Sequence, residues 1–449
     1  MWTRRDGAAV AAIAALAFAV RAVLASLTAV VATDSPSFLL FAEEMGRGRW
    51  DAGLEHGIHP AYPVAIAMAG SVLGLERGAY AVSALFGALA VVPFFAMVRD
   101  MTDRRVAVVA SLVFACLPYF VMEHADVMSE GLFHFFFVTA VALGWFAATR
   151  GWVAGYVLAG MAGALAYMTR PEGVYVPVAV AGVTVLARSW RMIPAAIASC
   201  ALFVVLAMPL LLYWRHLTGE WKVTWRGSSE AALSTFRESK APPLGEQAPR
   251  NRGAGEAFAQ LGKVLVRSTL WFVAPLAALG AYFLRGRIRG LPAAYPACVA
   301  AGYLVPAMLA GAHGYAVSRR YLLIPILFVL PFVAIGVVAL SEWAQGRWAH
   351  GRRAVGVALA VALMAMLVVT VRPRRTDEVG IAEAGRWVRA NAPAEAVVYS
   401  DSAKVAWYVG RRVKVVAAEP PPGSYVVVTG EGGAGRCVAE FGRVRVYAR

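Results

Sequence analysis

Residues 192–212 read MIPAAIASCALFVVLAMPLLL and contain no charged side chain. A stretch of this length crosses the hydrocarbon core of a bilayer as one α-helix, because about 20 residues at about 1.5 Å each cover about 30 Å. Such a helix satisfies its own backbone hydrogen bonds, which lipid cannot do. The stretch therefore predicts a membrane-spanning helix.

The same pattern recurs along the chain. Of its 449 residues, 60% are apolar and 16% are charged, and the mean hydropathy is +0.61, whereas a soluble domain is about 45–50% apolar. We therefore predict a mainly α fold: a polytopic membrane protein of about 11 transmembrane helices, with a small C-terminal α/β or α+β domain. The predicted spans cover residues 8–31, 79–98, 106–121, 131–148, 152–168, 173–187, 192–212, 264–284, 291–312, 321–341 and 354–371.

Basic residues between the spans predict the orientation. With the N-terminus inside, the inner segments include Arg4-Arg5, Arg99 to Arg105 and Arg188 to Arg191, all rich in Arg. The opposite loops, 121–130 and 169–172, carry no basic residue and one basic residue. This distribution satisfies the positive-inside rule.

The apolar stretch from Tyr62 to Leu75 is an exception, because about 14 residues are too few to span a bilayer. If it did span, every later loop would change sides and Arg99 to Arg105 would face outward. We therefore expect a helix that lies in, or dips into, the outer leaflet. The C-terminus is then also outside.

We expect a transmembrane domain over residues 1–372, with a first outer loop at 32–78 and a large outer loop at 213–262. A small outer domain follows over 376–449. In it, Thr376-Asp377-Glu378 predicts a helix start. Short runs typical of β-strands are at 396–400, 413–417, 425–428 and 443–447.

The net charge of +16 does not indicate nucleic-acid binding, since most Lys and Arg lie in short loops between apolar runs and no basic helix or aromatic-studded sheet is predicted. The four cysteines include no C-x-x-C pair. We expect neither a disulfide framework nor a cysteine metal site.

Ionisable residues at the membrane boundary are costly and are therefore candidates for function. Asp34 lies a few residues after the first span, and His59-Pro60 follows in the same loop. In a functional role, Asp34 is a base or a metal ligand in the reaction. In a structural role, it is the N-cap of the helix that starts at Ser35-Pro36. His59 either contacts a substrate or is a hydrogen-bonded structural residue.

The segment from Glu123 to Glu130 holds three carboxylates and a histidine, without Lys or Arg. Asp126 and Glu130 are candidates for binding a sugar or a metal ion, and Ser129-Glu130 is alternatively a helix cap. The candidate metal ligands are thus Asp34, Asp126 and Glu130, for a divalent ion.

Two arginine motifs lie on the outer side, against the charge trend: Thr169-Arg170-Pro171-Glu172-Gly173 and Ser318-Arg319-Arg320-Tyr321. A guanidinium there can hold a phosphate through parallel N–H donors. Arg170 is alternatively a partner of Glu172, and the Arg319-Arg320 pair alternatively snorkels to the interface.

The order of these motifs resembles the GT-C membrane glycosyltransferases, and more narrowly the group similar to protein mannosyltransferases and aminoarabinose transferases (glycosyltransferase family 39). The resemblance covers about residues 1–345. It rests on Asp34, Trp50-Asp51, the His59-Pro60-x-Tyr-Pro63 motif, Ser129-Glu130, Thr-Arg-Pro-Glu-Gly at 169–173 and Arg-Tyr-x-x-x-Pro at 320–325.

The resemblance implies a polyprenyl-phosphate-sugar donor and transfer on the periplasmic side, usually with inversion at the sugar carbon. By matching position it assigns Asp34 as general base, Glu130 as a second catalytic carboxylate, and Arg170 and Arg320 as cations that face the donor phosphate. We expect the neighbouring Arg319 and Tyr321 to bind the donor phosphate too. His59, Asp126 and Glu172 would contact substrate. Protein mannosyltransferases often have an Asp-Glu pair and a His-Pro-Pro motif, where this chain has Asp34-Ser35 and His59-Pro60-Ala61.

The expected partners are this donor, an acceptor that is a glycan, a lipid or a protein, and membrane lipids. The expected location is the bacterial inner membrane. Two other classes fit the sequence: a transporter or flippase of lipid-linked saccharides, and a non-catalytic subunit of an envelope glycan complex. Against the transporter, we find no internal repeat, and the polar residues gather at the outer boundary rather than mid-span.

Overall fold

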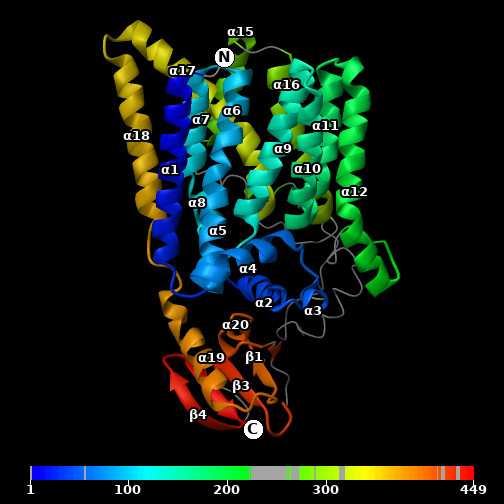
Figure 1. Ribbon diagram of the computed structural model, residues 1–449. Coiled ribbons are helices and arrows are strands. Elements are labelled where there is room, and N and C mark those ends of the chain that lie inside the picture. Colours follow the sequence, from blue (N-terminus) through cyan, green and yellow to red (C-terminus); the bar gives the residue numbers. More distant parts are fainter. Residues whose placement is uncertain are drawn as a thin grey trace.

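The computed structural model describes residues 3–54, 57–221, 223, 259, 262–263, 273–287, 290–312, 319–411, 413–415, 420–430 and 435–449. Most of the predicted outer loop 213–262 lies outside these residues, as does the start of the predicted span 264–284. Figure 1 shows a helical bundle with a small domain at one end, and the N-terminus lies at the other end.

The bundle consists of helices that run side by side (Figure 1). Their bounds are α1 Arg4–Ser26, α5 Leu75–Leu89, α6 Val91–Met101, α7 Arg104–Cys116, α8 Pro118–His124, α9 Glu130–Arg150, α10 Val153–Thr169, α11 Tyr175–Leu186, α12 Ile193–Thr218, α15 Val273–Arg287, α16 Leu291–Ala312, α17 Leu323–Arg347 and α18 Gly351–Thr370. Short 3-10 turns precede several of them: η1 Pro171–Val174, η2 Trp190–Met192 and η4 Arg319–Leu322.

The lengths and apolarity of these helices fit a membrane. In the part of the chain that is described, six helices are long and apolar enough to span a bilayer, and the bent pair α7 and α8 makes a seventh candidate. The shorter apolar helices α10, α11, α15 and α16 lie in the same bundle. The prediction of a mainly α, multi-pass membrane protein is confirmed, and the count of eleven spans stays a prediction.

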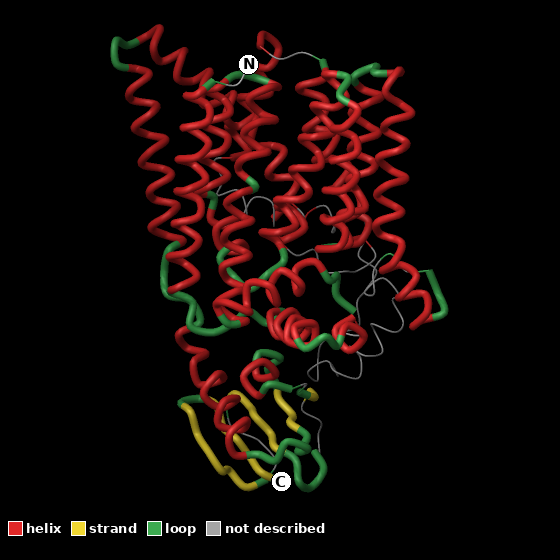
Figure 2. The backbone as a smooth tube through the Cα atoms, viewed as in Figure 1, coloured by secondary structure: helices red, strands yellow, loops and turns green. Residues whose placement is uncertain are grey.

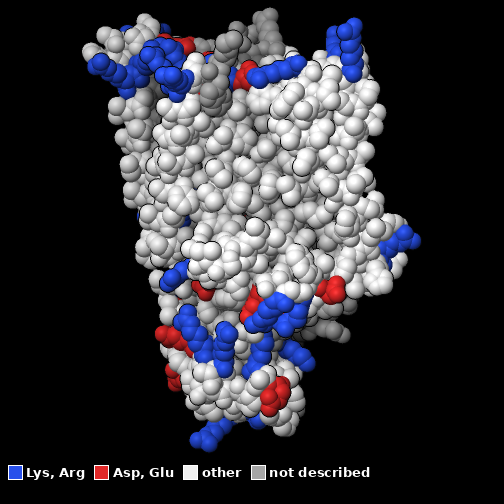
Figure 3. Space-filling model, viewed as in Figure 1, with Lys and Arg blue, Asp and Glu red and all other residues white. Residues whose placement is uncertain are grey.

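Burial separates the centre of the bundle from its lipid-facing surface. The apolar window of α17 is 89% buried, whereas that of α18 is 17% buried. On α18, Val357, Val361, Met364 and Val368 are each about 60% exposed. Because lipid is as apolar as these side chains, their exposure has little cost in a bilayer. Figure 3 shows the corresponding belt without Lys, Arg, Asp or Glu, between two charged ends.

The predicted span 106–121 is broken. Helix α7 ends at Cys116, α8 begins at Pro118, and the two axes differ by 57°. Pro118 has no N–H for the helix ladder, and it favours the extended conformation observed at Leu117. The break places the loop 125–129, between α8 and α9, at the end of the bundle that carries the small domain.

The first outer loop contains three short helices: α2 Ser35–Gly46, α3 Trp50–Leu54 and α4 Ala61–Leu73. Helix α4 corresponds to the apolar stretch that the sequence predicts to be non-spanning, and it lies across the end of the bundle rather than along it (Figure 1). Its Tyr62 is buried and hydrogen-bonds to Ser83 of α5 at 2.7 Å. Its depth in a membrane stays a prediction.

The small domain is an α/β unit, and Figure 2 shows the strands confined to it. After η5 Thr376–Glu378 come α19 Val379–Asn391, β1 Val398–Ser400, α20 Val405–Val409, β2 Lys414–Val415, β3 Tyr425–Thr429, β4 Arg436–Phe441 and β5 Val444–Ala448. The sheet order is β2-β1-β3-β5-β4. Strand β1 is parallel to β2 and β3, and β5 is antiparallel to β3 and β4. The helix start at Thr376 agrees with the prediction.

Four strands lie at the predicted runs, and β4 is additional. It is an edge strand whose side chains are mostly exposed, so its sequence RCVAEF has no clear apolar alternation. The domain contacts the bundle end through α20. There, the hydroxyl of Tyr408 accepts a hydrogen bond from the N–H of Val31 at 3.2 Å, and the indole N–H of Trp407 donates to Glu76 at 2.8 Å.

Candidate active site

The predicted outer motifs meet at the bundle end that carries the small domain, around a cavity of about 420 Å³. The N-terminal ends of α2 and α9, the segment before α4, the C-terminal end of α10 and the turns η1 and η4 contribute side chains. The lining residues are Asp34, Phe38, Gly57, Ile58, His59, Ser129, Thr169, Arg170, Pro171, Glu172, Val174, Tyr175, Val223, Arg320 and Tyr321.

Asp34 lies at the N-cap position of α2, but its side chain makes no capping hydrogen bond. Its Oδ2 instead accepts a hydrogen bond from a terminal guanidinium nitrogen of Arg320 at 2.7 Å. The side chains of Asp34 and Arg320 are 34% and 28% exposed. This carboxylate is therefore held by a cation and remains accessible from the cavity.

Glu130 links both arginine motifs. Its Oε1 accepts a hydrogen bond from Arg170 at 2.6 Å and lies 3.6 Å from Arg320. The Glu130 side chain is 2% exposed, so the two guanidinium groups cover it. A buried carboxylate between two guanidinium groups attracts both of them. It therefore holds them in position, because moving away from it would leave their positive charges less compensated.

Arg170 follows the last residue of α10, and Glu172 is in the next turn. The guanidinium donates two hydrogen bonds to the Glu172 carboxylate, at 2.9 and 3.2 Å, in addition to its bond to Glu130. It also donates to the Ser129 hydroxyl at 3.4 Å. The predicted pairing of Arg170 with Glu172 is thus present, and it holds the arginine at the cavity wall rather than away from it.

His59 and Tyr321 also line the cavity. The His59 ring packs edge-to-face against Tyr167 and Trp214, with ring centroids 5.0 Å apart in both cases. Arg319 begins the turn η4, and its side chain lies outside the described part of the chain. The structure thus brings together Asp34, His59, Glu172, Arg320 and Tyr321, from segments that are distant in sequence.

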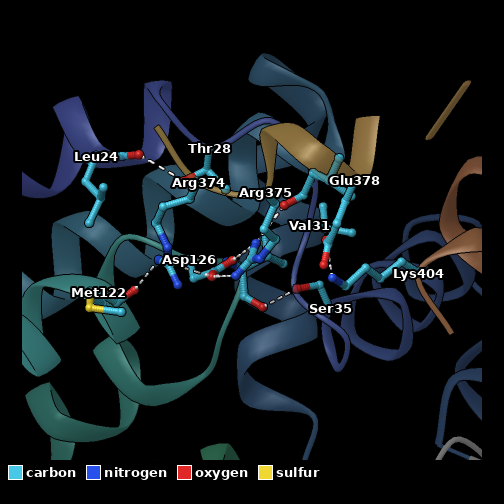
Figure 4. A network of polar contacts seen from close by, with 12 residues as sticks. Leu24, Thr28, Val31, Ser35, Met122, Asp126, Arg374, Arg375, Glu378 and Lys404 are labelled. Carbon is cyan, nitrogen blue, oxygen red and sulfur yellow. Dashed lines mark hydrogen bonds and ion pairs between the residues drawn. The ribbon is translucent and has the colours of Figure 1, made fainter. Parts of the chain in front are cut away.

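Asp126 is not among the residues that line the cavity. Its carboxylate is buried and pairs with Arg374 and Arg375, which follow α18 (Figure 4). Asp34 and Glu130 both lie next to Arg320. Among the residues that the structure describes, no three His, Cys, Asp or Glu side chains form a group that could hold a metal ion. The divalent metal ion that the sequence suggests stays a prediction.

The lining residues that are absent from the sequence-based candidates include two aromatic residues, Phe38 and Tyr175, and the contact of Ser129 with Arg170 is also not predicted. Phe38 and Tyr175 are aromatic residues near the outer ends of helices, where amphipathic rings are frequent for general reasons. Because aromatic residues are common at these positions, their presence in the sequence does not indicate a functional site. Ser129 occupies the N-cap position of α9, as the cap interpretation predicts, but its side chain makes no capping hydrogen bond.

Comparisons with known proteins bear on the family and the fold. Residues 58–214 match the family model of dolichyl-phosphate-mannose-protein mannosyltransferases. The matched range includes His59, Glu130, Arg170 and Glu172. No curated protein matches the chain in sequence.

The fold matches crystal structures of ArnT from Cupriavidus metallidurans. The form bound to undecaprenyl phosphate has a TM-score of 0.69 and 15% identity, and the apo form has 0.68 and 14%. Each match covers 97% of both chains. The apo oligosaccharyltransferase of Archaeoglobus fulgidus has a TM-score of 0.57 and 13% identity, over 90% of this chain and 64% of that one.

The chain is a membrane glycosyltransferase with the GT-C fold. The family match and the shared architecture, from the helical bundle to the terminal domain, confirm the resemblance seen in the sequence. In this glycosyltransferase most of the motifs that carry the resemblance contribute to one cavity, with Asp34, His59, Ser129, residues 169–172, Arg320 and Tyr321, whereas Trp50-Asp51 lies outside its lining.

Proposed function

We propose that this glycosyltransferase moves a sugar from a polyprenyl-phosphate donor to an acceptor on the outer face of a bacterial plasma membrane, with Asp34 as the general base. One observation carries the proposal: a carboxylate and two guanidinium groups, Asp34, Arg170 and Arg320, line the same cavity. The donor's leaving group is a phosphate, whose negative charge cations stabilise. The attacking group of the acceptor substrate must lose a proton, which a base takes up.

The guanidinium groups suit the leaving group. A sugar linked to a polyprenyl phosphate carries one negative charge, and bond cleavage at the sugar carbon adds a second. Arg170 and Arg320 are held by carboxylates in fixed positions, so they can stabilise the developing charge without reorganising. Tyr321, which follows Arg320, adds a hydroxyl at the cavity wall. The ArnT crystal structure with undecaprenyl phosphate is consistent with a ligand of this chemistry.

The proposed reaction is a single displacement at the anomeric carbon. An acceptor hydroxyl or amine attacks this carbon, and the bond from the carbon to the phosphate oxygen breaks. Asp34 takes the proton from the acceptor, and the polyprenyl phosphate departs with the bonding electron pair. Glu130 keeps both guanidinium groups in place but is itself buried behind them. His59 and Glu172 would contact the sugar from the cavity wall.

The charge distribution supports an outward-facing site. The cavity lies at the bundle end opposite the N-terminus (Figure 1), whereas the Arg-rich segments that the positive-inside rule assigns to the cytoplasm cluster near the N-terminal end. There, Arg99 and Arg104 lie 3.6 and 3.4 Å from Asp6 of α1.

Mass spectrometry of polyprenyl-phosphate sugars would test the proposal. Membranes would be compared from a deletion strain and from the same strain producing wild-type protein or Asp34→Asn. We expect one such lipid to accumulate in the deletion and in the Asp34→Asn strain, and its mass would identify the sugar. Equal amounts in all strains would contradict the proposed donor, and accumulation that Asp34→Asn relieves would exclude Asp34 as the base.

A further inference from the structure

The loop between α8 and α9 connects the site to the segment that leads into the small domain. It covers residues 125–129 and runs directly into Glu130. Three of its groups are held from different sides: the Asp126 carboxylate and the carbonyl groups of Val127 and Met128. Because both Glu130 and Asp34 adjoin these contacts, the loop can set the geometry of the site.

The first contact is the ion pair of Asp126 with Arg375, supported by Arg374. In Figure 4 both arginines extend toward Asp126 from the segment after α18. The Arg375 guanidinium donates to both carboxylate oxygens of Asp126, and Arg374 lies 3.5 Å from the same group. The Asp126 side chain is only 4% exposed. Burial is the largest single influence and lowers the pKa of Arg375, but the hydrogen bond and the charge of Asp126, together with the other acidic groups nearby, outweigh it, and the pKa is raised.

The arginines also bind the backbone on both sides. Arg375 donates to the carbonyl of Val30 at 2.6 Å, and Arg374 donates to the carbonyl of Met122 at 3.3 Å. The backbone of Arg374 pairs with that of Thr28 as an isolated parallel β-bridge. The segment thus joins the α1–α2 connection, which leads to Asp34, to the end of α8.

The second contact reaches Asp34 directly. Ser35, the next residue, is fully buried and donates its hydroxyl to the carbonyl of Val127 at 2.9 Å. On the other side of the loop, the Ser83 hydroxyl donates to the carbonyl of Met128 at 2.9 Å. The start of α2 is therefore attached to the residue that follows Asp126.

Arg375 adopts a left-handed backbone conformation, with φ of 55°. A non-glycine residue in this region is strained and persists where surrounding contacts over-determine it. For Arg375, these contacts are the hydrogen bonds of its guanidinium to the Asp126 carboxylate and to the Val30 carbonyl. The strain indicates that the position of this guanidinium is determined by its tertiary partners rather than by local preference.

We propose that Asp126 and Arg375 are positioning residues: their buried ion pair holds the loop 125–129 so that Asp34 faces the acceptor and Glu130 keeps Arg170 and Arg320 in place for the donor phosphate. This inference rests on the proposed function, and it gives the segment before the small domain a role in the chemistry. Asp126 acts through the loop and does not touch the substrate.

The test compares Arg375→Lys with Arg372→Lys in the full-length protein. Arg375→Lys keeps a positive charge beside Asp126. A single ammonium nitrogen replaces the guanidinium nitrogens, so it cannot bind both Asp126 oxygens and the Val30 carbonyl in the same way. Arg372 lies in the same segment, is exposed, and donates to the backbone carbonyl of Val368 among the residues that the structure describes, so Arg372→Lys is the matched control. The measurement is the turnover number and the donor KM in detergent, with the thermal unfolding midpoint alongside.

We expect Arg375→Lys to lower kcat about 10- to 100-fold, because a shift of about 1 Å at a reacting group can cost about 100-fold. The donor KM should change less than threefold, since Arg170 and Arg320 keep their charges and their carboxylate partners. A purely structural role would lower the unfolding midpoint and leave kcat per folded molecule unchanged, which would overturn the inference.

Ser35→Ala provides a second test that changes no charge. If both contacts act through the loop, the effects of Ser35→Ala and Arg375→Lys on kcat are less than multiplicative in the double variant. Independent, multiplicative effects would contradict positioning through the loop. A wild-type protein without transfer from any polyprenyl-phosphate sugar would instead refute the proposed function.

Discussion

Asp34 and Arg320 are 286 positions apart in the sequence and form an ion pair of 2.7 Å at the cavity. The pair joins the first outer loop to the turn before α17. Arg320 also lies 3.6 Å from Glu130, so one guanidinium faces two carboxylates of different exposure. A phosphate that binds Arg320 would therefore lie beside the accessible carboxylate, which is the arrangement that sugar transfer requires.

The first prediction concerns the proposed base. Asp34→Asn keeps the shape of the side chain but cannot take a proton from the acceptor, so transfer should fall about 100- to 10,000-fold. Protein level and thermal midpoint should stay near wild type, since Asp34 is one-third exposed. Asp51→Asn, an exposed carboxylate on α3 outside the cavity lining, is the control. Transfer by Asp34→Asn at the wild-type rate would remove Asp34 from the mechanism.

The second prediction concerns the buried carboxylate that holds both arginines. Glu130→Gln removes the negative charge between Arg170 and Arg320, and loss of one partner of a buried ion pair costs about 3–5 kcal/mol. We expect a lower thermal midpoint and a lower kcat. The exposed pair of Glu44 with Arg49 gives a matched control, because Glu44→Gln should change both quantities little. A Glu130→Gln protein with wild-type kcat and stability would contradict the proposed holding role.

The bundle was predictable because a bilayer imposes a simple requirement on sequence: each span needs an apolar run of a certain length. The run 106–121 shows the limit of that requirement. Its apolarity continues past Cys116, but Pro118 breaks the helix there. Strand β4 shows another limit, because the exposed side chains of an edge strand leave little apolar pattern to detect.

The site was predictable in its residue types but not in its pairings. Charged residues at the outer helix ends pointed to Asp34, Glu130, Arg170 and Arg320, since such residues are costly near lipid. Which carboxylate pairs with which arginine depends on helix packing between distant segments. Asp126 illustrates this, because its partner Arg375 lies 249 positions away and no local pattern indicates the contact.

The third prediction concerns the donor phosphate. Arg320→Lys keeps a cation near Asp34 but loses the planar pair of donors, so the donor KM should rise about 10- to 100-fold, in line with about 1.5–3 kcal/mol for a hydrogen bond to a charged group. The fall in kcat should be smaller. Arg47→Lys, an exposed arginine paired with Glu43 on α2, is the control. Unchanged donor KM with loss of folded protein would favour the snorkelling interpretation.

The last prediction concerns the turn that holds Arg170. Gly173, in η1, has no space for a side chain, because a Cβ atom there would overlap backbone atoms of Ala166 and Tyr167. Gly173→Ala should push η1 away from the end of α10 and move Glu172 relative to Arg170. Overpacking of this kind typically costs about 1–3 kcal/mol.

We therefore expect Gly173→Ala to lower both the thermal midpoint and transfer, measured on the same detergent-purified sample. Gly182 of α11 has open space at the corresponding atom, so Gly182→Ala should leave transfer unchanged and gain up to about 1 kcal/mol of helix stability. If the two variants behaved alike, the close contact of η1 with α10 would have no part in setting the position of Arg170. A fall in the midpoint of Gly173→Ala without a fall in transfer would limit the contact to stability.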